Sequence, residues 1–251
     1  MLTLERQQLI IQLLKEREMV TVQQLCQITK ASESTIRRDL TELENKQMIK
    51  RVHGGASLLK KKKEEPTLLE KAVQFSKEKE QIAKYAASLI DDGDAIFLDA
   101  GTTTMHMIPY LEDKATIVVT NGIPHVQLLM EYGVETYVLA GKAKQGTQAL
   151  VGTKAVDALK EYQFDKCFLG MNGISIARGF TTPDPEEANV KKQAMNQTQT
   201  SYVLIDDTKV GEVTFAHVAS LDAAAIITSS GIAEEQVNKL REKTTVKVVT
   251  E

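Results

Sequence analysis

The sequence predicts two domains of different class: a small α+β domain over residues 1–58 and a larger α/β domain over 76–251, joined by a linker over 59–75. In the first part, apolar residues recur at helical spacing, and two short β-prone runs flank a pair of glycines. From residue 76 onward, helical and strand patterns alternate, which is typical of a mostly parallel sheet covered by helices. A chain of 251 residues is long enough to bury a small and a medium-sized core.

Charge divides the chain in nearly the same place. Residues 1–63 carry 13 Lys and Arg against 7 Asp and Glu, a net charge of +6, whereas residues 64–251 carry 18 against 27, a net charge of −9. A basic first quarter on an acidic remainder suggests that only the N-terminal part binds a polyanion.

The composition predicts a cytoplasmic protein. No apolar run approaches the roughly 20 residues that a membrane-spanning helix needs, so we expect no membrane contact. The N-terminus also lacks a signal-peptide pattern. Cys26 and Cys167 lie far apart in apolar surroundings, without a neighbouring Cys or His. We therefore expect free thiols in a reducing compartment, and neither a metal site nor a cofactor.

Three helices are expected in the first domain. Leu4–Glu18 repeats apolar residues along one helical face, and Thr21 can cap a second helix over Val22–Ile28. After a tight turn, Ser32 can cap a third helix over Ser32–Lys46. Three helices with a brief turn between the second and third match a helix-turn-helix, whose later helix enters the major groove of DNA.

The third helix combines an inward face with a polar one. Ile36, Leu40 and Leu43 recur at helical spacing, which leaves hydroxyls and guanidiniums largely off that face. Arginine can donate two parallel hydrogen bonds to a guanine edge or a phosphate, and short hydroxyls reach phosphate oxygens. Taken alone, the helix is equally consistent with an amphipathic helix whose arginines face water. The residues expected to bind DNA from this helix are Ser32, Ser34, Thr35, Arg37 and Arg38.

Residues 49–58 predict a β-hairpin around Gly54 and Gly55. A hairpin after a three-helix unit forms a wing, so we expect Arg51, His53 and Gly54 to contact DNA as well. His53 is as consistent with structural packing as with DNA contact, whereas Arg51 keeps its charge at all relevant pH. The charge runs and the proline of residues 60–70 then mark a solvated linker.

The larger domain is predicted as alternating helices and strands. The expected strands are 95–99, 116–120, 135–140, 166–170, 202–206, 224–228 and 245–249, and the expected helices include 78–91, 105–111, 186–196 and 234–242. In an open α/β sheet, ligands bind beyond the carboxyl ends of the strands.

Polar clusters fall at those strand ends. Residues 99–104, Asp-Ala-Gly-Thr-Thr-Thr, follow one strand and open a helix, and free amides, hydroxyls and a glycine there suit a phosphate group. Glu187 and Lys191 stand one helical turn apart and form either an exposed ion pair or contacts to sugar hydroxyls. Together the clusters suit a polyhydroxylated anion. The residues expected to bind this effector are Asp99, Gly101, Thr102, Thr103, Thr104, Asn121, Gly122, Glu187, Lys191, Asp206 and Lys209.

The N-terminal residues resemble the DeoR family of bacterial transcriptional regulators. The family pattern can be followed as Arg6, Ile10 and Leu14 at intervals of four, then as residues 32–40, Ser-Glu-Ser-Thr-Ile-Arg-Arg-Asp-Leu. It continues in residues 51–56, Arg-Val-His-Gly-Gly-Ala. Asp39 is an unusual acid in a DNA-facing helix, and we expect it to orient an arginine or to cap locally.

Residues 76–232 resemble the effector domain of the same family, which is similar in fold to ribose-5-phosphate isomerase and senses phosphorylated sugars. The matching segments are 99–103, 120–122, 170–173, 179–182, Glu187 with Lys191, and 206–211. Residues 179–187 most resemble fructose operon repressors of Gram-positive bacteria, which implies fructose 1-phosphate as the effector. Residues 206–211 read Asp-Asp-Thr-Lys-Val-Gly instead of the usual Asp-Ser-Ser-Lys-Phe-Gly, which leaves the exact ligand open.

We therefore expect a transcriptional repressor of a sugar-utilisation operon that binds double-stranded operator DNA as a homo-oligomer, a dimer or a tetramer. A phosphorylated sugar would release it. One alternative is an isomerase-like enzyme with a DNA-binding appendage, in which Asp99, Asp206 or Glu187 would move a proton. The other alternative is a transcriptional activator. A repressor is favoured over an enzyme because an enzyme does not need the N-terminal domain.

Overall fold

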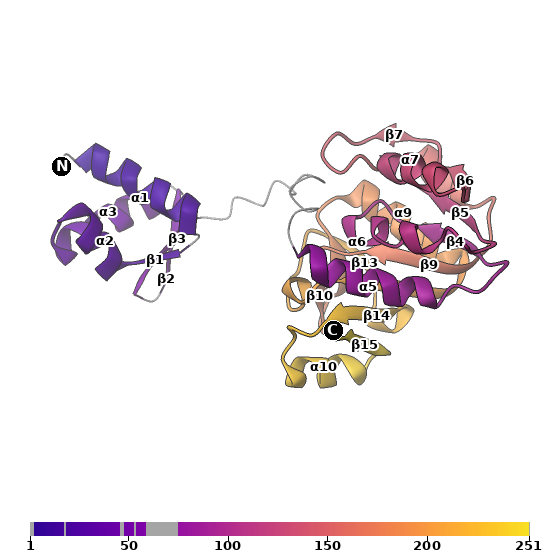
Figure 1. Cartoon of the computed structure of the whole chain (residues 1–251). Coiled ribbons are helices and arrows are strands. Elements are labelled where there is room, and N and C mark those ends of the chain that lie inside the picture. The colour runs from indigo at the N-terminus through magenta and orange to yellow at the C-terminus, as the bar shows by residue number, and fades with distance from the viewer. Residues whose placement is uncertain (1–2, 18, 46–47, 53, 59–74, 251) are drawn as a thin grey trace. The chain divides into compact units, whose positions relative to one another are not determined.

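The computed structural model describes residues 3–17, 19–45, 48–52, 54–58 and 75–250. The chain divides into two compact units, Met1–Glu64 and Glu65–Glu251, which are described separately (Figure 1). Apart from Phe75, the linker expected over residues 59–75 lies outside the described residues. The domain boundaries therefore stay a prediction.

The first unit combines helices with a small antiparallel sheet of strand order β1-β3-β2. The predicted helices and hairpin all form, and no helix end differs from its predicted position by more than one residue. Strand β1 was not predicted, because three residues are too few to show an alternating pattern. The described elements are α1 (Thr3–Arg17), β1 (Met19–Thr21), α2 (Val22–Thr29), α3 (Glu33–Asn45), β2 (Ile49–Val52) and β3 (Gly55–Leu58).

Side-chain caps start the second and third helices. The Gln24 amide donates to the Thr21 hydroxyl at 3.2 Å, and the Thr21 amide donates to the Gln24 side chain at 2.9 Å, which completes a capping box. The Thr35 amide likewise donates to the Ser32 hydroxyl at 3.3 Å. Lys30, in the left-handed region at φ 56°, ends α2. The turn between α2 and α3 is therefore specified by local sequence.

The hairpin needs its two glycines for different reasons. Gly54 has φ +78°, which L side chains rarely adopt. A Cβ on Gly55 would lie 2.3 Å from the carbonyl oxygen of Val20 in β1. The second glycine therefore allows β3 to lie between β1 and β2.

A buried ion pair accompanies the apolar core of this unit. Ile36, Leu40 and Leu43 are buried, as their spacing predicts. Asp39 is also buried and accepts hydrogen bonds from Arg6 at 2.5 and 3.2 Å. Asp39 therefore orients an arginine of α1, one of the two structural roles expected for it.

The second unit is built on a seven-stranded sheet in which every strand pair is parallel. This confirms the predicted parallel α/β sheet. In spatial order the strands are β15 (Val246–Val249), β14 (Ala225–Ser229), β12 (Thr198–Ile205), β9 (Phe164–Gly170), β4 (Ala95–Leu98), β5 (Ile117–Thr120) and β6 (Glu135–Val138).

Helices pack on both faces of this sheet, because consecutive strand residues point to opposite sides. In β4, Ile96 and Leu98 belong to a core with α5 and α7, whereas Phe97 belongs to a core with α8, α9 and α10. The helices are α5 (Ser76–Ser88), α6 (Thr102–Met105), α7 (Ile123–Glu131), α8 (Thr153–Leu159), α9 (Pro185–Asn196) and α10 (Glu234–Arg241).

Short elements at the ends of the parallel strands were not predicted. An antiparallel sheet consists of β10 (Gly173–Ser175), β11 (Gly179–Thr182) and β13 (Ala216–Ala219). A hairpin pairs β7 (Lys142–Ala143) with β8 (Leu150–Val151), and short 3-10 turns include η1 (Ile108–Tyr110) and η2 (Asp207–Lys209). These strands are too short to stand out as periodic segments.

The helix predicted over residues 105–111 is wrong in position. The helix α6 begins earlier, at Thr102, and ends at Met105, and η1 follows after a break. Pro109 has no amide hydrogen to donate to the preceding turn, so one continuous α-helix cannot run through it.

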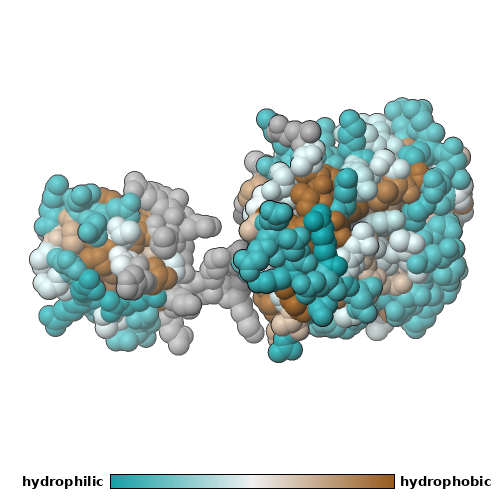
Figure 2. All heavy atoms as spheres, turned by 90° about the horizontal axis from the view of Figure 1, so that it is seen from below, coloured by the Kyte–Doolittle hydropathy of each residue, from teal (hydrophilic) through white to brown (hydrophobic). Residues whose placement is uncertain are grey.

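Figure 2 shows hydrophilic side chains over much of the face in view, with smaller apolar areas between them. None of the described helices is both long enough and apolar enough to cross a membrane.

Candidate functional site

A cluster of hydroxyls lies at the start of α3. The Ser32 Oγ lies 3.0 Å from the Ser34 Oγ and 2.8 Å from the Thr35 Oγ1. Ser32 and Ser34 are exposed and Thr35 is half-buried. The three predicted hydroxyl residues therefore form one polar, accessible group of donors at the end of the helix.

Two arginines follow on the exposed side of α3. Arg37 donates to the Glu33 carboxylate at 2.6 and 2.9 Å, and both side chains are more than half exposed. An exposed pair of this kind contributes little, at most about 1 kcal/mol, so a phosphate or a base edge can replace Glu33 as the partner of Arg37. Arg38 is exposed as well.

The hairpin and α3 share one surface. Arg51 Nη1 donates to the Thr41 hydroxyl at 3.2 Å, and the Arg51 amide donates to Glu44 at 3.0 Å. A shallow hollow between the two elements is lined by Arg37, Glu44, Arg51, Val52 and Gly54. The structure thus brings three of the predicted residues, Arg37, Arg51 and Gly54, to one hollow. The other predicted residues of α3 do not line it, and His53 lies outside the described residues.

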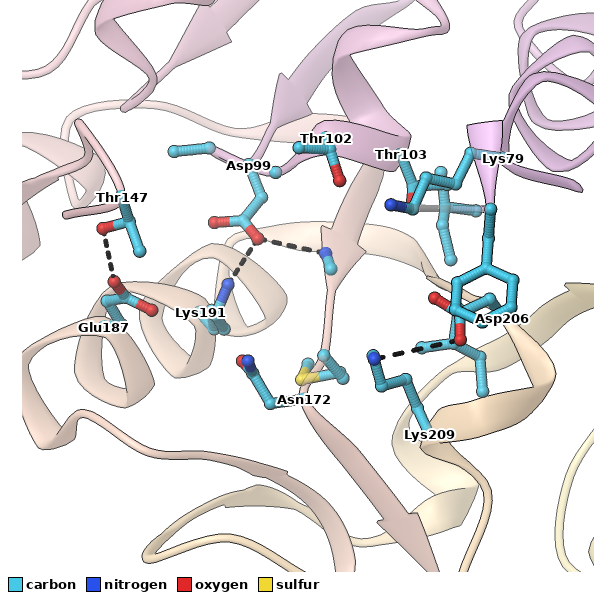
Figure 3. Close-up of a pocket in the computed structure, with 17 residues that line it drawn as sticks. Lys79, Asp99, Thr102, Thr103, Thr147, Asn172, Glu187, Lys191, Asp206 and Lys209 are labelled. Carbon is cyan, nitrogen blue, oxygen red and sulfur yellow. Dashed lines mark hydrogen bonds and ion pairs between the residues drawn. The ribbon is translucent and has the colours of Figure 1, made fainter. Parts of the chain in front are cut away.

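The second unit has a pocket at the carboxyl ends of β4, β9 and β12 (Figure 3). This is the edge of the sheet where a ligand was expected. The charged and polar residues that line the pocket are Lys79, Asp99, Thr102, Thr103, Thr147, Asn172, Glu187, Lys191, Asp206 and Lys209.

A buried ion pair occupies the middle of this pocket. The Lys191 ammonium, from α9, donates to Asp99 Oδ2 at the end of β4, and the Gly170 amide donates to the same oxygen at 3.0 Å. Side chains from two distant segments are therefore held together by charge with almost no access to water.

Glu187 lies one turn before Lys191 and has partners from the β7–β8 hairpin. Its Oε1 accepts from Lys144 Nζ at 2.7 Å and from the Thr147 hydroxyl at 2.8 Å. Lys144 also contacts Asp184 at 2.9 Å. Burial alone would raise the pKa of Asp184, but the hydrogen bonds from Lys144 and from backbone amides lower it overall. These four residues connect the hairpin to the start of α9.

The third carboxylate of the pocket is Asp206, which follows β12. It accepts from the amide of Thr208 at 3.1 Å and from the hydroxyl of the same residue, and Lys209 Nζ lies 3.9 Å away. Lys209 is partly exposed, in contrast to the buried Lys79 and Lys191. Lys209 is therefore a cation that a ligand entering from solvent can reach.

Three predicted residues do not line the pocket: Thr104, Asn121 and Gly122. Two of them support the segment that does. The Asn121 Oδ1 accepts from the Ala100 amide at 2.8 Å. The Thr104 hydroxyl lies 2.6 Å from the Asp99 carbonyl oxygen and 2.8 Å from that of Gly101. Thr104 and Asn121 therefore fix the backbone of residues 99–101 by hydrogen bonds without lining the pocket themselves.

The role of Gly122 involves a buried histidine that was not predicted. His125 Nε2 lies 3.1 Å from the Thr104 hydroxyl. A Cβ on Gly122 would lie 2.4 Å from His125 Nδ1, so only glycine leaves room for this ring. Complete burial lowers the pKa of His125 to about 4, which keeps the imidazole neutral near pH 7.

The pocket also contains residues that sequence reasoning missed. Lys79 is buried on the inner face of α5, in register with Ile82 and Ala86. A lysine in the apolar register of a helix is a signal that could have identified it. Thr147 belongs to a short hairpin that was not predicted, and Asn172 to a matched segment that was not assigned to the site.

The short length of α6 changes one part of the predicted phosphate site. That site relied on the amides of a longer helix, and α6 has four residues. The Thr102 and Thr103 side chains nevertheless face the pocket. Among the described residues, no group of three His, Cys, Asp or Glu side chains could hold a metal ion.

Comparison with known proteins gave matches to both units. Residues 6–62 match the model of the DeoR-like helix-turn-helix domain, and residues 74–230 match that of the DeoR C terminal sensor domain.

Curated relatives match over most of their length. The chain is 47% identical over 251 residues to the "Uncharacterized HTH-type transcriptional regulator FruR" of Bacillus subtilis, which covers 99% of both chains. It is 34% identical over 226 residues to the "HTH-type transcriptional repressor GlcR" of the same organism, covering 87% of this chain and 84% of the relative. It is 32% identical over 232 residues to the "Lactose phosphotransferase system repressor" of Staphylococcus epidermidis, covering 90% and 92%. Among solved structures, ribose 5-phosphate isomerase A from Methanocaldococcus jannaschii aligns with a TM-score of 0.40 and 20% identity over 53% of each chain.

Proposed function

The chain belongs to the DeoR family of transcriptional regulators, and from this membership we propose that it represses a sugar-utilisation operon until a phosphorylated sugar releases it from operator DNA. Its curated relatives are regulators and repressors, so the chain is a DNA-binding regulator and not an enzyme. This sets aside the isomerase-like alternative. A cytoplasmic location belongs to the proposal.

The surface shared by α3 and the hairpin supports the DNA-binding role of specific residues. Arg37 and Arg38 extend from α3 into solvent, and Arg51 lies beside Thr41 of the same helix. We assign the arginines to base edges and phosphates, and the hydroxyls of Ser32, Ser34 and Thr35 to phosphate oxygens. Gly54, at the turn of the hairpin, and His53, which lies outside the described residues, complete the proposed set.

The effector proposal is carried by one observation: lysines and carboxylates from segments far apart in sequence converge in the pocket at the carboxyl edge of the sheet. Lys209 and Lys79, with the Thr102 and Thr103 hydroxyls, suit the phosphate group. Carboxylates are hydrogen-bond acceptors for sugar hydroxyls, and the pocket supplies Asp99, Glu187 and Asp206.

Fructose 1-phosphate is the first ligand to test. Residues 179–187 resemble fructose operon repressors, and within this segment Asp184 accepts from the Glu186 amide and thereby starts α9. That helix carries Glu187 and Lys191 into the pocket. The segment that carries the resemblance thus sets the position of two lining residues.

Release from DNA requires that the ligand bind one arrangement of the protein better than another. Binding to two operator half-sites requires two DNA-binding domains, so the proposal includes a homo-oligomer. A ligand with higher affinity for the arrangement that cannot bind DNA shifts the population toward it, by as much as its differential affinity.

The experiment is a thermal-shift screen of phosphorylated sugars with the full-length chain. Free ligand at 100 times its dissociation constant adds about 2.7 kcal/mol to the free energy of unfolding. We expect fructose 1-phosphate, but not fructose, to raise the melting temperature of the wild-type chain. The Lys209→Met variant should lose most of this shift. The control Lys160→Met removes an exposed lysine that pairs with Asp157 outside the pocket, and it should keep the shift.

A shift that survives Lys209→Met would contradict the assignment of the phosphate. If fructose 1-phosphate fails and another phosphorylated sugar succeeds, the identity of the sugar is wrong but the pocket stands. Transcription from a reporter fused to the operator separates the two kinds of regulator. Deletion of a repressor raises expression, whereas deletion of an activator lowers it.

A further inference from the structure

One edge of the seven-stranded sheet is open. Strand β6 ends the strand order, and no other described strand pairs with its outer side (Figure 1). The Leu139 amide donates to the Thr120 carbonyl of β5 at 3.0 Å. Backbone groups alternate in direction along a strand. The amide and carbonyl of Tyr137 therefore point toward β5, like those of Leu139, whereas the amides and carbonyls of Thr136 and Val138 point outward. These outward groups form a row of donors and acceptors.

The opposite edge of the sheet is protected in a way that β6 is not. In β15, Val246 and Val249 are buried, and the Lys247 ammonium lies 4.9 Å from the centre of the Tyr85 ring. A lysine on an edge strand discourages pairing with another strand. Strand β6 contains no lysine or arginine, and it exposes 45% of Tyr137 and 48% of Val138. The two edges therefore differ in their capacity to add a strand.

The apolar surface continues from β6 onto α7. Ile123, Val126 and Met130 recur at spacings of three and four residues along one side of α7. Ile123 is 45% exposed and Met130 is 69% exposed. In the β5–β6 register Val118 pairs with Thr136, and Val118 belongs to the core beneath α7, so Val138 lies on the α7 face of the sheet as well. An apolar strip thus flanks the open strand edge.

We propose that this edge is a homodimer interface, in which β6 pairs antiparallel with β6 of a second copy about a two-fold axis. The inference rests on the proposed function, which needs an oligomer, and it names the surface that would form one. Only outward-facing residues can exchange hydrogen bonds across such an edge. The proposed register places the two-fold axis at Tyr137. In it Thr136 pairs with Val138 of the partner subunit, and each such pair exchanges both of its N–H···O=C bonds.

A second copy in this register brings compatible side chains together. Tyr137 falls opposite the partner's Tyr137, an aromatic cross-strand pair. Glu135 falls opposite the partner's Leu139, so no like charges face each other. A two-fold contact also closes on itself, since the pairing uses up both open β6 edges and leaves none for a third copy.

Cysteine cross-linking tests the register directly. In this register the two Tyr137 residues form a non-hydrogen-bonded pair with Cα atoms about 4.5 Å apart, within the range of about 4.4–6.8 Å that disulfides span. Two Glu135 residues would lie about 13 Å apart along the strands, from about 3.3 Å per residue. In full-length chain carrying Cys26→Ser, we expect Tyr137→Cys to form a disulfide-linked dimer on mild oxidation and Glu135→Cys to remain uncross-linked.

Light scattering of the uncross-linked protein gives the second measurement. We expect a dimeric or larger mass for the wild-type chain and half that mass for Tyr137→Lys, which places two ammonium groups opposite each other. Circular dichroism checks that Tyr137→Lys is folded.

Equal cross-linking of both cysteine variants would indicate random collision and would overturn the interface. A wild-type oligomer that neither Tyr137→Cys traps nor Tyr137→Lys dissociates would overturn the interface and leave the proposed repressor intact. A monomeric wild-type chain that still binds operator half-sites in pairs would overturn the interface as well. A monomer that binds no paired sites would overturn both proposals.

Discussion

Replacing Lys191 with methionine tests the buried ion pair at the centre of the pocket. Methionine keeps most of the aliphatic volume of lysine but removes the ammonium that donates to Asp99. The side chains of Lys191 and Asp99 are 6% and 2% exposed, so little water can reach Asp99 to replace the lost partner. The substitution therefore leaves a carboxylate buried without its counter-ion.

The magnitude follows from that burial. Removing one partner of a buried pair costs about 3–5 kcal/mol, because the remaining charge is uncompensated. The Gly170 amide still donates to Asp99 at 3.0 Å, which favours the lower end, about 3 kcal/mol. For a domain of 150–250 residues, 1 kcal/mol shifts the melting temperature by about 2–4 °C. We expect the melting transition of the second unit to fall by about 6–12 °C.

Calorimetry of the full-length chain provides the measurement, and a double variant provides the decisive comparison. Lys191→Met with Asp99→Asn removes both charges, so it should be more stable than Lys191→Met alone. The matched control Lys160→Met breaks an exposed pair with Asp157 and should cost less than about 1 kcal/mol. A loss for Lys191→Met no larger than for the control, or a double variant as unstable as the sum of its parts, would refute the reasoning.

Three further predictions concern both units. Arg37→Ala should weaken operator binding by about 1–3 kcal/mol in fluorescence anisotropy, since one arginine contact to a base edge is lost. The thermal shift by a sugar phosphate should be unchanged, and loss of both activities would contradict separate sites. Asp39→Asn should lower the stability of the first unit by about 3 kcal/mol in denaturant unfolding, because Arg6 keeps its charge in a buried position. A cost below 1 kcal/mol would mean that water reaches the guanidinium. The unfolded chain protonates His125 near pH 6.5 and the folded chain only near pH 4, so the free energy of unfolding should fall by about 3 kcal/mol as the pH drops across this window. His125→Gln should remove that part of the pH dependence, and an unchanged profile would assign it to other groups.

The helices of the first unit could be predicted from local signals in the sequence. Its contacts between distant segments could not. The caps at Thr21 and Ser32 act within three residues of the chain, so the helix starts can be read from sequence. Strand β1 depends on pairing with β3 more than thirty residues away, as in Val20 with Ala56. A three-residue strand has no pattern of its own, and the only local trace of this contact is a second glycine at the hairpin.

Some of the pocket residues were predicted from their positions at strand ends, but their partners were not. Asp99 and Asp206 follow strands directly, and Lys209 lies in the turn after Asp206, so the sheet rule brings them to one edge. Glu187 and Lys191 were expected to pair with each other or to reach a ligand. In the structure Lys191 meets Asp99, 92 residues away, and Glu187 meets Lys144 of an unpredicted hairpin. Such pairings depend on the three-dimensional path of the chain and leave no periodic signature.

Under the proposed function, the ion pairs already present in the pocket affect which sugars it can distinguish. Lys191 and Lys209 already lie beside Asp99 and Asp206, so an uncharged sugar that displaced either carboxylate would leave ionic groups without counter-ions. A phosphomonoester carries its own negative charge, so its phosphate can replace a carboxylate as the counter-ion of a lysine. Under the proposed function, discrimination against free sugars depends on this exchange. Replacing Asp206 with asparagine leaves Lys209 without its nearby carboxylate and removes a charge that repels the phosphate, so the difference in affinity between a sugar and its phosphate should widen.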